Sequence, residues 1–261
     1  MNWINVGIGC IESAIKELKE IKEVKALNSE INIQTNADLV SNKAIINFLK
    51  DNKIKCNVFS EEEKGALKIN GGNERIIFVV DPIDNTHLYL RGEISFCSVA
   101  LMILVNGVPE YSFVGDISNE DIYYCDKSFA YKNEKRIRIS SKIQGRNIIL
   151  GWAPYKLRIE RLFGNLSDLT EDNYYLYNFG GQLQAVKIAT GNYDAYVEIR
   201  AETLNEFCGA VIVERSGGIV STAKGEKIIY EPKKKQTLII ARNKKIYNAI
   251  LNKLKDKNYE N

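Results

Sequence analysis

An apolar run that ends directly on two aspartates constrains this chain more than any other stretch of its sequence. The segment Ile76–Val80 is short, apolar and rich in β-branched residues, which is typical of a buried β-strand. Asp81 and Asp84 follow it, with Pro82 between them. Burying a charge costs several kcal/mol per ion unless a partner compensates it. The pattern therefore predicts a cation at the end of this strand, provided that other segments supply further ligands.

The composition excludes two classes of partner. The chain has 261 residues, 45% of them hydrophobic, and a net charge of +3. That length allows one large domain or two modest ones with real cores. Lysine and arginine are spread along the chain with one short run at Lys233–Lys235, so we expect no nucleic-acid polymer as a partner. No stretch reaches the length of a membrane span, so we expect no membrane partner.

The five cysteines stand singly, with no CxxC pair. This spacing excludes a zinc finger and a disulfide framework. Isolated cysteines in apolar surroundings are typical of buried free thiols in a reducing compartment. The first ten residues lack the cationic start and apolar core of a secretory signal. We therefore expect a cytoplasmic protein.

Residues 1–140 are expected to form an α+β domain. Periodic apolar residues predict helices over 3–24 and 37–51, the second capped by Thr35 or Asn36. Short apolar runs predict strands at Cys56–Phe59, Ile76–Val80, Ser95–Val105, Val108–Val114 and Ile122–Tyr124. Asn106-Gly107 between two of these runs predicts a hairpin turn.

Residues 141–261 are expected to form an α/β domain that completes the site. A polar, basic segment over 133–145 marks the change. Strand-like and helix-like segments then alternate, which favours an α/β layer. The expected strands are Ile148–Gly151, Tyr174–Tyr177, Tyr193–Ile199, Ile219–Ser221 and Leu238–Ala241, and the expected helices are Tyr155–Phe163, Gln182–Thr190, Leu204–Arg215 and 244–255.

Acidic or amide side chains stand at the ends of four predicted elements. They are Asp38, then Glu61 with Glu62, then Asp81 with Asp84, and finally Asn205 with Glu206. Oxygen ligands of this kind hold hard cations such as Mg²⁺. The chain has one histidine and no cysteine cluster, so an oxygen-ligated metal fits far better than zinc.

The same residues resemble a known family. The stretch "VVDPIDNTHLYLRG" at 79–92 is similar to the metal-binding signature DPIDGT of the inositol monophosphatase / fructose-1,6-bisphosphatase superfamily. The strings "TNAD" ending at Asp38, "SEE" at Ser60–Glu62, "ATGNYDAYVEIR" at 189–200 and "SGG" at 216–218 follow in the family's order. The resemblance is strongest to archaeal members, in which inositol phosphate and fructose bisphosphate activities can share one enzyme. It implies a layered α/β/α/β/α sandwich of the sugar phosphatase type.

The resemblance also implies a reaction and a site. It implies a metal-dependent phosphatase for inositol monophosphate or fructose 1,6-bisphosphate, with two or three Mg²⁺ ions that Mn²⁺ could replace. The metal ligands it implies are Glu61, Asp81, the carbonyl of Ile83, Asp84 and the position of Asn205. The catalytic residues are Asp38, Thr86 and Glu61, and the substrate-binding residues are Asn85, Thr86, Asp194 and Arg200. Lithium inhibition and a homodimer are implied in the same way.

Two positions depart from the family pattern. Asn85 replaces the glycine of the signature, and asparagine tolerates the left-handed backbone that such a glycine adopts. Asn205 replaces an aspartate and Leu204 the tryptophan before it, which removes one negative charge and should weaken the second metal. Glu206 is adjacent, but on an α-helix one residue turns a side chain by about 100°. An apolar helix face starting at Leu204 therefore speaks against Glu206 as a substitute.

Alternatives stay open at this point. The string "LYLRG" at 88–92 is similar to a segment of 3′-phosphoadenosine 5′-phosphate phosphatases, so a nucleotide substrate is a second hypothesis. Asn205 supports a third, a catalytically weakened homologue with a binding or regulatory role. His87 is expected to pack at the rim, Glu63 to be solvated, and Arg200 fits an ion pair as well as a substrate contact. Glu62 is left without an assigned role.

Overall fold

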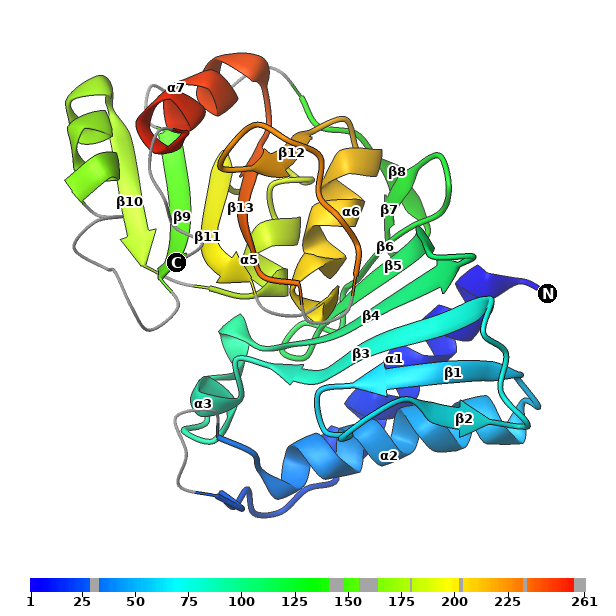
Figure 1. Ribbon diagram of the computed structural model, residues 1–261. Coiled ribbons are helices and arrows are strands. Elements are labelled where there is room, and N and C mark those ends of the chain that lie inside the picture. Colours follow the sequence, from blue (N-terminus) through cyan, green and yellow to red (C-terminus); the bar gives the residue numbers. More distant parts are fainter. Residues whose placement is uncertain are drawn as a thin grey trace.

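The computed structural model describes residues 1–28, 33–140, 148–154, 164–178, 180–201, 204–231 and 234–255. Helices and two sheets stack as five layers, with α1 and α2 on one face of the first sheet, α5 and α6 between the sheets, and α7 outside the second sheet (Figure 1). The expected α/β/α/β/α sandwich is therefore confirmed. No helix in the described ranges is long and apolar enough to cross a bilayer.

The two N-terminal helices begin at side-chain caps. Helix α1 spans Trp3–Lys19, where the side chain of Asn2 accepts the first free N–H groups, and α2 spans Asn36–Asp51. Thr35 caps α2, one of the two caps expected for it. Helix α1 ends five residues before the predicted end at residue 24, because Ile21 and Val24, which continue its apolar pattern, pack against the same core from the segment after the helix.

The first sheet has eight strands in the order β2-β1-β3-β4-β5-β6-β7-β8. The strands are β1 (Cys56–Ser60), β2 (Leu67–Ile69), β3 (Ile76–Asp84), β4 (Ser98–Val105), β5 (Val108–Asp116), β6 (Ile122–Cys125), β7 (Ala130–Lys132) and β8 (Lys135–Ile137). Strand β1 runs parallel to β3, and the later strands pair as antiparallel hairpins. The predicted turn at Asn106-Gly107 is confirmed, with φ of 51° and 79°.

The second sheet has five strands in the order β10-β9-β11-β13-β12. The strands are β9 (Ile148–Pro154), β10 (Tyr174–Asn178), β11 (Ala195–Ala201), β12 (Ile219–Thr222) and β13 (Gln236–Ala241), and the helices are α5 (Gln182–Val186), α6 (Cys208–Arg215) and α7 (Lys244–Leu254). Strand β9 is parallel to β10 and β11, whereas β13 is antiparallel to both of its neighbours. A division into domains at residues 140 and 141 stays a prediction.

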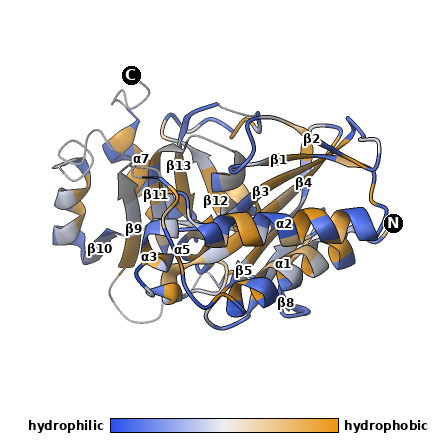
Figure 2. Ribbon diagram, turned by 90° about the horizontal axis from the view of Figure 1, so that it is seen from below, coloured by the Kyte–Doolittle hydropathy of each residue, from blue (hydrophilic) through white to orange (hydrophobic). Residues whose placement is uncertain are grey.

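Three apolar clusters fill the spaces between the layers. One joins α1 and α2 to the first sheet, one joins both sheets through α5 and α6, and one joins the second sheet to α7. Figure 2 shows hydrophobic residues along the strands and mixed colouring on α1 and α2. All five cysteines are buried free thiols, as predicted. The site therefore sits on a scaffold that is packed on both sides.

Three segments differ from their predicted form, and a fourth is not tested. Strand β3 continues through Pro82 to Asp84, with a register shift between Asp81 and Asp84, whereas the run was expected to stop at Val80. Proline is tolerated there because a bulge needs no ladder donor. The segment expected to be a helix over Gln182–Thr190 is helical only to Val186. The expected strand Ser95–Val105 starts with a 3₁₀ turn, η1 (Ile94–Phe96), and the expected helix Tyr155–Phe163 lies outside the described residues.

Candidate metal and phosphate site

Asp81 lies at the centre of the candidate site, near the end of β3. Its side chain is only 5% exposed, and its Oδ1 has no hydrogen-bond partner among the described residues. Burial raises the pKa of Asp81 well above its usual range, and the negative charges of Glu61 and Asp84 raise it further. This carboxylate oxygen is buried without a donor and lies beside other carboxylates. A bound cation would stabilise its charged form.

Asp84 is held from two directions by one of its oxygens. Its Oδ2 accepts hydrogen bonds from the Ser98 hydroxyl at 3.0 Å and from the backbone N–H of Gln182 at 2.7 Å. Burial raises the pKa of Asp84 to about 6, although these two hydrogen bonds act in the opposite direction. Asp84 is therefore fixed in place by donors from both halves of the chain.

Glu61 follows β1 and is placed beside β3 by the sheet. Its backbone N–H donates to the carbonyl of Val80 at 3.2 Å. Among the charges that raise the pKa of Asp81, that of Glu61 contributes most. Glu61, Asp81 and Asp84 are thus brought together, although they come from two strands.

The neighbouring glutamates have other surroundings. The side-chain amide of Gln34 donates to Glu62, whose pKa is raised to about 7 by burial despite that bond. Asn42 donates to the exposed Glu63 at 3.1 Å. His87 is exposed, and the hydrogen bonds that hold Asp38 and Asp84 come from other residues. Glu62 therefore borders the cluster, and Glu63 lies at the surface as expected.

Asp38 and Thr86 form a hydrogen-bonded pair across the start of α2 and α3 (Thr86–Tyr89). The Thr86 hydroxyl lies 3.0 Å from Asp38 Oδ1 and 2.8 Å from the carbonyl oxygen of Ile83. Asp38 is 1% exposed, and the N–H and hydroxyl of Thr35 donate to its Oδ2 at 2.8 and 2.5 Å. Burial raises the pKa of Asp38 while the hydrogen bonds from Thr35 and Thr86 oppose the shift. The threonine hydroxyl has one proton, so it can donate to Asp38 or to Ile83 at one time.

Asn85 has the left-handed conformation predicted for it, with φ of 67°. Its side-chain amide donates to the carbonyls of Phe96 at 3.0 Å and Gly180 at 2.9 Å. These bonds turn the side chain toward the second half of the chain. The backbone N–H groups at the start of α3 have no acceptor within their own helix, as at any helix N-terminus.

A second group of buried residues near Asp84 was not predicted. Gly181 has φ of 112°, and a Cβ there would lie 2.5 Å from Asp84 Oδ2 and 2.4 Å from Asn85 Nδ2, so only glycine fits. Its N–H donates to the hydroxyl of Tyr196, which in turn lies 3.1 Å from Glu198 Oε2. Burial, followed by the charge of Asp84, raises the pKa of Glu198 to about 8. The sequence signal was a glutamate inside an otherwise apolar strand.

Asp194, for which the resemblance implies a substrate contact, is buried between strands of the second sheet. Its Oδ1 lies 2.6 Å from Nη1 of Arg242, and its Oδ2 accepts the N–H of Ile149 at 2.8 Å. Both oxygens are therefore occupied in the protein interior. Arg200 belongs to β11, and its side chain lies outside the described part of the structure.

The segment around Asn205 is a 3₁₀ turn, η3 (Leu204–Phe207), that precedes α6. The prediction of one α-helix from Leu204 to Arg215 is therefore wrong in its first turn. The side chain of Asn205 lies outside the described part. Glu206 contributes to the negative charge that raises the pKa of Asp81, and its carbonyl accepts the side-chain amide of Gln182 at 2.7 Å.

The residues present fit a divalent cation bound together with its substrate. Among the described residues, no three histidine, cysteine, aspartate or glutamate side chains are gathered tightly enough to enclose an ion by themselves. Mg²⁺ in phosphate-processing sites is commonly held by one or two carboxylates, water and the substrate's phosphate. The unpartnered oxygen of Asp81 and the raised pKa of Asp84 match that arrangement.

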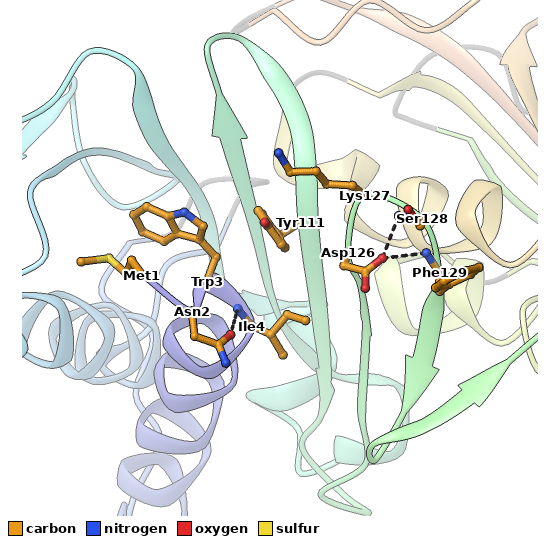
Figure 3. A pocket seen from close by; sticks show the side chains of 9 residues that line it. All are labelled: Met1, Asn2, Trp3, Ile4, Tyr111, Asp126, Lys127, Ser128 and Phe129. Atoms are coloured by element: carbon orange, nitrogen blue, oxygen red, sulfur yellow. Dashed lines mark hydrogen bonds between the residues drawn. The ribbon is translucent and has the colours of Figure 1, made fainter.

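A separate pocket of about 490 Å³ lies at the start of α1 (Figure 3). Trp3, Tyr111 and Phe129 line it, and none of the carboxylates of the candidate site does. Its acid, Asp126, already accepts the backbone N–H groups of Ser128 and Phe129. This pocket is therefore no part of the carboxylate site.

Comparison with known proteins gives a match over nearly the whole chain. The model of the family described as "Inositol monophosphatase family" matches residues 3–259. The "Nus factor SuhB" of Xylella fastidiosa is 26% identical over 76% of this chain and 71% of its own length. The "Fructose-1,6-bisphosphatase/inositol-1-monophosphatase" of Methanothermobacter thermautotrophicus is 28% identical over 83% of this chain and 81% of its own length.

Two further proteins are similar in other ways. The "Bifunctional NADP phosphatase/NAD kinase" of Methanococcus maripaludis is 26% identical over 73% of this chain, which matches 37% of that protein. The crystal structure of the extragenic suppressor protein suhB from Bartonella henselae superimposes with a TM-score of 0.83 at 20% identity, covering 98% of this chain and 99% of that one. The structural likeness supports the same fold.

Proposed function

Because this chain belongs to the inositol monophosphatase family and is a phosphatase, we propose that it hydrolyses a small phosphorylated sugar or polyol. The substrates we propose are inositol monophosphate, fructose 1,6-bisphosphate or both. The proposal includes Mg²⁺ as the natural ion, Mn²⁺ as a substitute, inhibition by lithium, a homodimer and a cytoplasmic location.

The observation that carries the proposal is the unpartnered Oδ1 of buried Asp81 beside Glu61 and Asp84. Glu61, Asp81 and the carbonyl of Ile83 would hold one ion, and Asp81 with Asp84 a second. Bound ions would neutralise these carboxylates, attract the phosphate dianion and lower the pKa of a water.

The chain's own groups would orient that water and the phosphate. Thr35 fixes Asp38 through Oδ2, and the other oxygen, Oδ1, accepts a hydrogen bond from the Thr86 hydroxyl. The lone pairs of that hydroxyl then remain available to orient a water. When the Thr86 hydroxyl donates to Asp38, the Ile83 carbonyl keeps its lone pairs for another partner. The N–H groups of Asn85 and Thr86 would bind phosphate oxygens at the start of α3.

Phosphate release from a panel of esters tests the proposal. We expect turnover of inositol-1-phosphate or fructose 1,6-bisphosphate with Mg²⁺ or Mn²⁺, and none after chelation by EDTA. The panel also contains 3′-phosphoadenosine 5′-phosphate and NADP. Equal turnover with and without EDTA would contradict the metal requirement. Turnover confined to the nucleotides would show that the substrate is a nucleotide and not a sugar or polyol.

A nucleotide substrate is the first alternative. The segment Leu88–Gly92 supports it, as does the name of the Methanococcus relative, a phosphatase of NADP. A binding or regulatory role is the second, supported by Asn205 and by relatives named as Nus factors. Absence of turnover for every ester would favour that role, and an Asn205→Asp variant that gains turnover would indicate an impaired site.

A further inference from the structure

The second half of the chain contributes a carboxylate to the surroundings of Asp81. The negative charges that act on Asp81 are those of Glu61, Asp84, Asp38 and Glu206. The first three precede residue 90, whereas Glu206 lies on η3. Residue 205, where the family pattern has its aspartate, is an uncharged asparagine. A negative charge from this segment is therefore present, but one position later.

The form of η3 changes the geometry on which the objection to Glu206 was based. In a 3₁₀ helix residues three apart share one face and successive residues are about 120° apart, so positions 204 and 207 lie on one face and Glu206 lies off it. Phe207 is fully buried and packs edge-on against Tyr230, with ring centroids 6.2 Å apart, which fixes the rotation of the turn. The turn lies against β3 and β4. Glu206 is half-buried and lies on the turn that meets the strand carrying Asp81.

Gln182 connects this turn to Asp84. Its backbone N–H donates to Asp84 Oδ2, its Nε2 donates to the carbonyl of Glu206, and its Oε1 accepts the N–H of Gly209, each at 2.7 Å. Gln182 is 1% exposed. One buried residue thus fixes the distance between the carboxylate on β3 and the turn that carries Glu206.

We propose that Glu206 takes the place of the family aspartate as the metal-site carboxylate from the second half of the chain, and that Gln182 is the positioning residue that holds it there. The proposal rests on the proposed metal-dependent function.

A titration of the metal-free full chain with Mn²⁺ tests the proposal. Electron paramagnetic resonance measures the free ion at each step. We expect Glu206→Gln to lower the affinity for one Mn²⁺ ion by about tenfold or more, because the change removes the charge and keeps the shape of the side chain. The double variant Asn205→Asp with Glu206→Gln should restore that affinity. The melting temperature of the metal-free variants should stay close to that of the wild type, which separates a lost ligand from a lost fold.

Gln182 has a matched control on the same helix. Gln184 is equally buried, but its amide donates to the carbonyl of Phe96 at 3.3 Å instead of to η3. Gln182→Ala should lower the affinity for the same Mn²⁺ ion by about tenfold, whereas Gln184→Ala should leave Mn²⁺ binding unchanged. Equal effects of the two variants would overturn the positioning role.

Two outcomes distinguish this inference from the proposed function. If the wild type binds Mn²⁺ and releases phosphate while Glu206→Gln has an unchanged binding curve, the assignment of Glu206 is overturned and the phosphatase proposal stands. If the wild type releases phosphate but binds no Mn²⁺, the metal-dependent mechanism is overturned and this inference with it.

Discussion

The two sides of the site are built by different kinds of contact. On the side of β3, α2 and α3, the acids lie at or near the ends of strands and helices, and Asp38 is held by a near neighbour, Thr35. On the side of α5 and η3, the contacts span long sequence separations, since Gln182 and Asp84 are 98 residues apart and Asn85 and Gly180 are 95 apart. The first side can be recognised as a motif, whereas the second exists only once the chain has folded.

The largest effect is expected from the first side. Asp81→Asn should lower phosphate release with Mg²⁺ by about 10³-fold or more, because it removes the charge that would hold the ions. The same change should raise the melting temperature of the metal-free protein, because the wild-type charge is buried without a donor. Glu63→Gln, an exposed acid nearby, is the control and should change neither quantity. Full turnover by Asp81→Asn would contradict the assignment.

Thr86 should have the next largest effect. Thr86→Val keeps the shape but removes the hydroxyl that lies between Asp38 and Ile83, and turnover should fall by about 10²–10³-fold. Thr86→Ser keeps the hydroxyl and should retain most of the turnover. Steady-state rates for the three proteins measure this, and equal rates for valine and serine would refute the water-orienting role.

Arg242 and Asp194, which lie in the second sheet behind the second side of the site, should affect stability rather than turnover. Arg242→Met leaves Asp194 buried without its ion-pair partner, and we expect a loss of about 3–5 kcal/mol in the free energy of unfolding. The exposed pair of Lys253 and Asp168 offers a control, since Lys253→Met should cost under about 1 kcal/mol. Urea denaturation measures both. An Arg242→Met protein of unchanged stability but altered KM would contradict this structural role and support a substrate contact for Asp194.

The stability of the metal-free protein should fall as the pH rises. The pKa of Asp84 is raised from 3.8 to about 6, and that of Glu198 from 4.5 to about 8. Between these values the folded protein holds protons that the unfolded chain has released, so raising the pH favours unfolding. Melting temperatures in EDTA from pH 4 to 8 measure this, and Mn²⁺ should restore most stability at the upper end. A metal-free protein that gains stability over this range would contradict the buried cluster.

Asn85, which ties the two sides together, should show the smallest effect. Asn85→Ala removes two hydrogen bonds and keeps the left-handed backbone, so it should cost about 2–3 kcal/mol. Asn85→Gly loses the same bonds but relieves the backbone, so it should cost about 1 kcal/mol less. Chemical denaturation compares them, and an equal cost would mean that the backbone carries no strain there.

The sequence predicts the layers of this fold better than the second side of its site. Periodic apolar runs located most strands and both N-terminal helices, and the capping role of Thr35 follows from local chemistry. The continuation of β3 through Pro82 was missed because a bulge depends on the partner strand. Gly181 and Gln182 were missed because their roles arise from contacts with Asp84, far away in the chain. The interior position of Asp194 depends on Arg242, which follows β13 and is 48 residues away in the chain.

We propose that the carboxylates at the ends of β1 and β3 hold divalent ions for phosphate ester hydrolysis. A crystal grown with Mn²⁺ and phosphate, with anomalous scattering used to locate the ions, tests it most directly. We expect Mn²⁺ bonded to Oδ1 of Asp81 and shared with Glu61 and Asp84. Crystals of an active preparation that show no ion at Asp81, with these three side chains pointing apart, would contradict it.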